Sequence, residues 1–201
     1  MRKTGSVNAS TTEKRRHIIF SALASFNMKG FTDASMEDIR SRAGVSNGSL
    51  YHHFKSKEQL AAAVYLEGIK DFQAVVIEAL NKADSAKNGV EALVFAHLFW
   101  MAENPDWARY LERMRHASFM KESEGAISEA NRIFGAAMCG FFERHMESGS
   151  IIRLPLGVAI ALVLGPCQEY GRLRLLGVTE DEWNRAAREI ARAAERAVCA
   201  D

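Results

Sequence analysis

The stretch at residues 43–57, AGVSNGSLYHHFKSK, brings together polar and aromatic side chains that are suited to contacting a nucleic acid. Hydroxyl, amide and imidazole groups donate hydrogen bonds to phosphates, and some of them also reach base edges in a DNA groove. The groups of this kind are Asn47, Ser49, Tyr51, His52 and His53. The two histidines are expected to be mostly neutral at pH 7 and so to act mainly as hydrogen-bond donors. The pattern predicts a face that contacts DNA.

The same stretch carries the local signals of a helix-turn-helix. Gly44 can adopt the positive φ that a tight turn between helices requires. Ser46 is a good N-cap for a short helix. Leu50 and Phe54 lie four residues apart, so they share one face and can anchor the helix to its neighbours. We therefore expect the turn and the second helix of the motif within this stretch.

Two earlier helices are expected to support the motif. Apolar residues recur at helical spacing from Thr12 to Lys29, and Gly30 follows where a C′ glycine belongs. Ser35 to Arg42 is predicted to be the next helix, with Ser35 as its N-cap and Asp38 completing a capping box. A helix N-terminus capped by a hydroxyl is also a phosphate site, so Ser35 has two possible roles.

Lys57 occupies an electrostatically unfavourable position at the start of the following helix. Ser56 to Gln59 reads Ser-x-x-Gln, a full capping box, and predicts a helix that begins there and runs to about Ala83. A cation in the first turn opposes the helix dipole by roughly a few tenths of a kcal/mol. A phosphate bound beside Lys57 would explain this arrangement.

The charge of the chain is unevenly divided. Residues 1–57 hold 10 Lys and Arg against 4 Asp and Glu, a net +6, and the remainder holds 16 against 21, a net −5. A basic head joined to an acidic body indicates that the head meets a polyanion. Charge alone does not exclude a chance fluctuation.

Several short segments together carry a resemblance to a known family. AGVS at 43–46, GSLYHHF at 48–54 and SKE at 56–58 match its pattern, and residues 30–39 match the connection between its first two helices. On these segments, residues 12–57 resemble the DNA-binding domain of the tetracycline-repressor-like (TetR) family of bacterial transcription regulators. The residues predicted to bind DNA are Ser35, Ser46, Asn47, Gly48, Ser49, Tyr51, His52, His53 and Lys57.

The resemblance also implies roles for individual residues. Those matching Tyr51, His53 and Lys57 commonly touch phosphates in the family. Those matching Asn47, Gly48 and His52 lie near base edges. Asn47 departs from the pattern because a basic residue is common at this position, so its role as a base reader stays open.

The resemblance implies an all-α subunit of about nine helices. The low number of prolines, three, and the absence of strand-like alternation of apolar and polar residues favour the same class. A flexible arm at 1–11 is expected to precede a three-helix helix-turn-helix domain at 12–57. A larger helical domain for effector binding and dimerisation is expected at 58–201. Its later helices are predicted at 88–103, 104–119, 123–147 and 155–176, and from a capping box at Thr179 to about Val198.

In the family, a small ligand binds in the body between the fourth and eighth helices. The candidate wall here is aromatic and Met-rich, which points to a small, largely apolar effector. Its members are Trp100, Met101, Trp107, Tyr110, Met114, His116, Phe119, Phe134, Met138, Phe142 and Tyr170. Plain core packing would bury the same side chains, and this alternative stays open.

The family forms homodimers through its last two helices. Plausible contacts on the first of these are Val158, Leu162, Gly165 and Leu173. The second carries a predicted apolar stripe made of Trp183, Ala187, Ile190, Ala194 and Val198. Such a stripe would be costly if it were exposed in a monomer.

Catalytic and metal chemistry find little support in the sequence. No nucleophile–base motif appears, and His97, His116, Cys139 and His145 lack the spacing of metal ligands. The three cysteines form no CxxC pair, and no apolar run is long enough to span a bilayer. We therefore expect a cytoplasmic protein that is not an enzyme and that has no metal, no cofactor and no membrane partner.

The expected function is that of a homodimeric transcriptional repressor that binds double-stranded DNA at a palindromic operator and leaves it when a small effector binds. Two alternatives stay open. One is a helix-turn-helix activator, and the other is a small-molecule-binding protein whose DNA head is vestigial.

Overall fold

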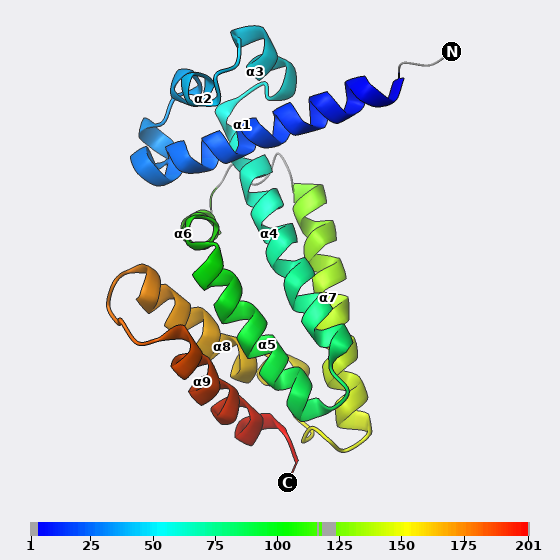
Figure 1. Cartoon of the computed structure of the whole chain (residues 1–201). Helices are drawn as coiled ribbons and strands as arrows, with labels where there is room; N and C mark the ends of the chain where they lie inside the picture. The colour runs from blue at the N-terminus through cyan, green and yellow to red at the C-terminus, as the bar shows by residue number, and fades with distance from the viewer. Residues whose placement is uncertain (1–3, 116, 118–123, 201) are drawn as a thin grey trace. The chain divides into compact units, whose positions relative to one another are not determined.

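The computed structural model describes residues 4–115, 117 and 124–200, with side chains from residue 11 onward. Nine helices account for most of these described residues (Figure 1). They are α1 (Thr4–Asp33), α2 (Met36–Ala43), α3 (Asn47–His53), α4 (Lys57–Lys82), α5 (Ala86–Glu103), α6 (Pro105–Met114), α7 (Glu124–Glu147), α8 (Leu156–Leu175) and α9 (Trp183–Val198). Within these residues the β-pairing is an isolated antiparallel bridge between Ile151 and Cys199. The predicted all-α class is confirmed.

The chain divides into two compact units. The head unit comprises Met1–Gly68 and Arg109–Ile127, and the body unit comprises Ile69–Ala108 and Ser128–Asp201. The helices α4, α6 and α7 each contribute residues to both units.

The head unit is built on the apolar faces of its helices. Ile19, Leu23 and Phe26 recur at helical spacing along α1, and all three are buried, as the sequence predicted. The ring of Phe26 stacks on that of Tyr110, with ring centroids 5.8 Å apart. Leu50 is also buried, so α3 has one inward face that fixes its orientation within this unit.

Local hydrogen bonds begin and end the short helices as the sequence predicted. Ser35 caps α2: its hydroxyl oxygen accepts the Asp38 N–H at 3.1 Å, and the Asp38 carboxylate accepts the Ser35 N–H at 3.0 Å. Gly44 ends α2 in the left-handed region at φ 60°. Ser46 then caps α3 by accepting the Ser49 N–H at 3.2 Å. These bonds close within four residues, so they need no tertiary support.

The body unit is centred on α5, which packs against α8 and α9, while these two helices also pack against each other (Figure 1). Its buried core includes Val90, Leu93, Leu98, Met138, Phe142, Val163, Cys167, Ala187 and Val198. Gln73 is a buried polar residue of this unit, and its Nε2 donates to Asn131 Oδ1 at 2.9 Å. That bond satisfies an amide that would otherwise be costly to bury.

Two predicted helix starts are wrong. α1 begins at Thr4 rather than Thr12, so residues 4–11, which were predicted to belong to a flexible arm, extend the helix instead. α5 begins at Ala86 with Ser85 as its N-cap, rather than at Asn88. Gly89 therefore lies inside α5, and a β-carbon there would overlap the ring of Phe141. This glycine permits a close helix approach and does not break the helix.

The boundaries near two later connections also differ from the prediction. α6 ends at Met114, before the predicted residue 119. α9 begins at Trp183, so the predicted capping box at Thr179 is wrong. The Thr179 hydroxyl instead donates to Asp181 Oδ2 at 2.7 Å, and Arg174 Nη1 donates to the Thr179 carbonyl at 2.9 Å. These contacts hold Thr179 in the loop.

Candidate functional site

The recognition helix α3 has one buried face and one exposed face. Leu50 and the C-cap residue Phe54 are buried in the head unit. The predicted DNA-binding residues of the opposite face are exposed or half-buried; they are Ser46, Asn47, Gly48, Ser49, Tyr51, His52 and His53. Tyr51 as a whole residue is 44% exposed, which leaves it available to a partner.

Basic and imidazole groups meet at the C-terminal end of α3. The rings of His52 and His53 lie edge to face, with centroids 5.2 Å apart. The guanidinium of Arg15 lies over the Phe54 ring at 5.1 Å from its centroid. Burial lowers the pKa of His53 below its ordinary value, and the charges of His52, Arg15 and Lys14 lower it further. Lys14 and Arg15 thus place positive charge beside this end of α3, where a phosphate can bind.

Ser35 lies at the exposed N-terminus of α2, where it is already engaged. Its hydroxyl donates to Asp38 Oδ2 at 2.9 Å. Lys29 Nζ donates to the other oxygen of that carboxylate at 2.7 Å. This bond and those from Ser35 hold the pKa of Asp38 well below its ordinary value. A phosphate at this helix end would therefore meet a carboxylate as well as Ser35.

Lys57 forms a bridge between two segments of the head unit. Its ammonium donates to the carbonyl oxygens of Phe31, Thr32 and Ala34 at 2.8, 3.0 and 3.0 Å. It also lies 4.6 Å from the centroid of the Phe31 ring. An ammonium has three N–H donors, and here all three are used. These carbonyls follow the non-helical Gly30, and they supply the partial negative charge that was predicted to come from a phosphate.

The predicted effector wall is divided between the two units. Trp100, Met101, Trp107, Phe134, Met138, Phe142 and Tyr170 belong to the body unit, whereas Tyr110 and Met114 belong to the head unit. His116 and Phe119 lie outside the described residues.

Several members of this predicted wall already have partners within their own unit. The Tyr110 hydroxyl donates to the Ala61 carbonyl at 2.9 Å, and burial raises the pKa of this phenol well above its ordinary value. The Tyr170 ring packs edge to face on Trp183, and its hydroxyl donates to the Asp181 carbonyl at 3.1 Å. Met138 is buried in the body core. Core packing accounts for these three side chains.

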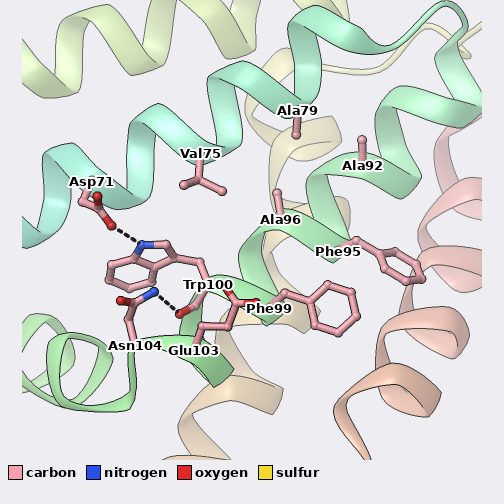
Figure 2. A pocket seen from close by; sticks show the side chains of 10 residues that line it. All are labelled: Asp71, Val75, Ala79, Ala92, Phe95, Ala96, Phe99, Trp100, Glu103 and Asn104. Carbon is pink, nitrogen blue, oxygen red and sulfur yellow. Dashed lines mark hydrogen bonds between the residues drawn. The ribbon is translucent and has the colours of Figure 1, made fainter.

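A groove of about 490 Å³ lies on the body unit between α4 and α5 (Figure 2). We call it the α4–α5 groove. It is lined by Asp71, Val75, Ala79, Ala92, Phe95, Ala96, Phe99, Trp100, Glu103 and Asn104. Only Trp100 was predicted as a ligand contact. The other nine were not predicted, because they lie on or directly after two helices whose facing sides are not apparent from either helix alone.

The predicted dimer contacts fall into three groups by exposure. Val158 and Leu162 on α8 are 44% and 38% exposed, so they remain available to a partner. Gly165, Leu173, Trp183 and Ile190 are half-buried. Ala187 and Ala194 are buried in the subunit's own core, as is Val198, so these three are removed from the predicted contacts. The apolar stripe of α9 packs on its own subunit because its small side chains permit a close approach.

The described residues contain no group of three or more His, Cys, Asp or Glu side chains placed to hold a metal ion. Among the helices described, none is both long and apolar enough to cross a membrane.

Comparisons with known proteins agree with this architecture. A family model described as bacterial regulatory proteins, tetR family, matches residues 18–64. The repressor KstR2 of Rhodococcus jostii (strain RHA1) is 27% identical over 138 residues, which cover 68% of this chain and 67% of that relative. The activator FasR of Mycolicibacterium smegmatis is 33% identical over 84 residues, which cover 42% of this chain and only 38% of that relative.

The fold is shared with solved structures over most of the chain. FadR of Bacillus subtilis, solved in complex with stearoyl-CoA, is 19% identical with a TM-score of 0.77, and the match covers 89% of this chain and 96% of that one. At this identity the likeness shows the fold alone.

A recognition helix that is anchored on one face and exposed on the other, in a helix-turn-helix, defines a DNA-binding regulator. Residues 18–64 match the TetR family of bacterial regulatory proteins, and the chain as a whole resembles regulators of that family in sequence and shares their fold. The resemblance read from residues 12–57 is thereby confirmed. Because the family consists of transcription regulators, the expectation that the chain is not an enzyme is confirmed as well.

Proposed function

We propose that the chain is a homodimeric, ligand-responsive repressor that binds a palindromic operator in double-stranded DNA within the cytoplasm. The observation that carries the proposal is the exposed face of α3. Asn47, Tyr51 and His52 are exposed there and available to DNA, while the buried Leu50 anchors the helix to the head unit. Direct readout requires such a face to enter the major groove.

The proposed division of labour follows the sequence boundaries. Residues 12–57 read DNA, and residues 58–201 bind the effector and the second subunit. A dimer with a two-fold axis presents two copies of α3 to half-sites one helical turn or more apart, which requires a palindromic operator. The exposed Val158 and Leu162 on α8 support a dimer seam along that helix.

The proposed effector is a small, largely apolar molecule. The body unit supplies half-buried aromatic and thioether side chains such as Met101 and Phe134. A neighbour of the same fold was solved with stearoyl-CoA, a ligand with a long apolar chain. Effector binding releases the operator only if the effector prefers the conformation that binds DNA weakly.

Operator binding is tested by selecting DNA from a library of random sequence and measuring affinity by fluorescence anisotropy. We expect the selected sequences to contain an inverted repeat, and Tyr51→Ala to weaken binding by about tenfold, since a single contact contributes roughly 1–3 kcal/mol. Glu91→Ala, on the exposed surface of α5, is the matched control and retains affinity. Selection of sequences without any repeat would contradict the palindromic operator.

Activation is the second candidate because FasR, a relative, is an activator. A reporter placed behind the selected operator distinguishes the two functions. Deletion of the regulator raises expression if the chain represses the promoter and lowers it if the chain activates.

A further inference from the structure

The α4–α5 groove presents an apolar surface that the body unit itself does not cover. Phe95 and Phe99 lie one helical turn apart on α5, and their rings meet edge to face with centroids 5.3 Å apart. Val75 faces them from α4 and is 39% exposed. Figure 2 shows Val75 and three alanines between the two helices, with the Phe95 and Phe99 rings beside them on α5, and all of these side chains line the groove. The small alanines leave the space that the larger residues enclose.

One end of the groove is acidic. Asp71 and Glu103 lie on either side of Trp100, and Asp71 Oδ2 accepts the indole N–H at 2.7 Å. Among the described residues that line the groove, none is Lys, Arg or His. Within the described part of the chain, neither carboxylate forms an ion pair, although carboxylates elsewhere on the body unit do, such as Glu78 and Glu129. The groove therefore has negative charge at one end and no cation to balance it.

The combination of apolar walls and two carboxylates selects the charge of a ligand. A hydrophobic anion would fit the walls but would be repelled by Asp71 and Glu103. A cation near Trp100 is attracted by both carboxylates and by the indole ring. The volume of about 490 Å³ is that of an organic molecule and far exceeds a metal ion.

We propose that the α4–α5 groove binds an amphipathic organic cation. Its positive group lies between Asp71 and Glu103, and its hydrocarbon or aromatic part lies over Val75, Phe95 and Phe99. This is a second ligand site beyond the proposed effector wall, with which it shares only Trp100. Cation binding requires no DNA, so it is measured on the full chain alone. A failure to bind the cation would therefore not affect the proposal that the chain binds an operator.

The test uses two probes that match in size and shape and differ in the sign of their charge, tetraphenylphosphonium and tetraphenylborate. Isothermal titration calorimetry is performed on the full-length protein with each probe. We expect the phosphonium to bind at least about tenfold more tightly than the borate, and its affinity to fall with added salt. Equal affinity for the two ions would overturn the proposal, and so would an absence of phosphonium binding.

Charge-neutralising variants locate the site. Asp71→Asn keeps an oxygen that accepts the Trp100 N–H, and Glu103→Gln keeps the shape of the side chain. Each is expected to weaken phosphonium binding about threefold, and the pair about tenfold. Glu91→Gln, an exposed residue of α5 outside the groove, is the matched control and leaves the affinity unchanged. Unchanged affinity in the double variant would refute the assignment.

A groove-filling variant separates a small ligand from a second copy of the chain. Ala96→Phe is expected to abolish phosphonium binding while the urea midpoint and the sedimentation coefficient stay unchanged. If a second subunit covers the groove instead, the wild type fails to bind the phosphonium and Ala96→Phe alters the sedimentation coefficient, which overturns the proposal.

Discussion

Replacing Lys57 by methionine tests whether its ammonium stabilises the head unit. Methionine keeps an unbranched stem against Phe31 but removes three N–H···O bonds to carbonyls at 2.8–3.0 Å. Because the carbonyls are partly exposed and regain water, each bond contributes about 1 kcal/mol. The contact with the Phe31 ring adds roughly 0.5–1 kcal/mol. The freed side-chain entropy offsets up to about 2 kcal/mol of this, so we expect a net loss of about 2 kcal/mol.

Urea unfolding followed by circular dichroism measures this loss. With a slope of roughly 1–3 kcal/mol per M, the midpoint of the transition that includes α1 is expected to fall by about 1 M. Lys55→Met is the matched control, because it removes a neighbouring exposed cation and leaves the three carbonyl contacts in place. Lys55→Met should leave the midpoint unchanged.

The same variant distinguishes the structural role of Lys57, which bonds three carbonyls of the head unit, from the phosphate contact that the sequence predicted. A lysine that neutralises one phosphate contributes about one unit to the slope of log affinity against log salt concentration. If the ammonium stays on the carbonyls in the complex, Lys57→Met weakens stability without changing that slope. Equal midpoints for Lys57→Met and Lys55→Met, together with a slope reduced by about one, would refute the structural role and support the phosphate contact.

Three further predictions follow from single contacts. Gly89→Ala should destabilise the body unit by about 1–3 kcal/mol in urea unfolding, because the overlap of the added methyl with the buried Phe141 ring outweighs the higher helix propensity of alanine. An unchanged urea midpoint would show that the ring moves aside. Burial lowers the pKa of His53, so the folded state favours the neutral imidazole, and stability should fall as the pH drops below 6.5, the pKa of an unperturbed histidine. The urea midpoint of His53→Gln should therefore fall less steeply between pH 7 and 5 than that of the wild type, and identical pH profiles would contradict this. Asn131→Ala leaves the buried Gln73 amide without its acceptor and should cost about 1–2 kcal/mol, whereas replacing both residues by leucine should cost less; calorimetric unfolding of the single and double variants compares the two.

The beginnings of the short helices could be predicted from the sequence because their causes are local. The Ser35–Asp38 capping box and the Ser46 cap each join groups only three residues apart. The positive φ of Gly44 follows from the turn that the same segment requires. The buried positions of Leu50 and Phe54 follow from helical spacing. Local chemistry and periodicity thus determined the helix-turn-helix and its exposed face.

Positions with long-range partners could not be predicted in the same way. Gly89 has the signature of a helix break, yet the ring that explains it belongs to Phe141 on another helix. Ala187 and Ala194 form an apolar stripe, but periodicity cannot distinguish packing on the chain's own core from packing on a second subunit.

The sequence by itself therefore determined the helical class, the family and the face of α3 that is available to DNA, because each depends on residues a few positions apart. Only the tertiary structure decided where the Lys57 ammonium goes, since its acceptors are 23–26 residues away in the chain. It also decided which side chains meet across α4 and α5. Asp71 and Trp100 are 29 residues apart, and only packing of the two helices joins them in one groove.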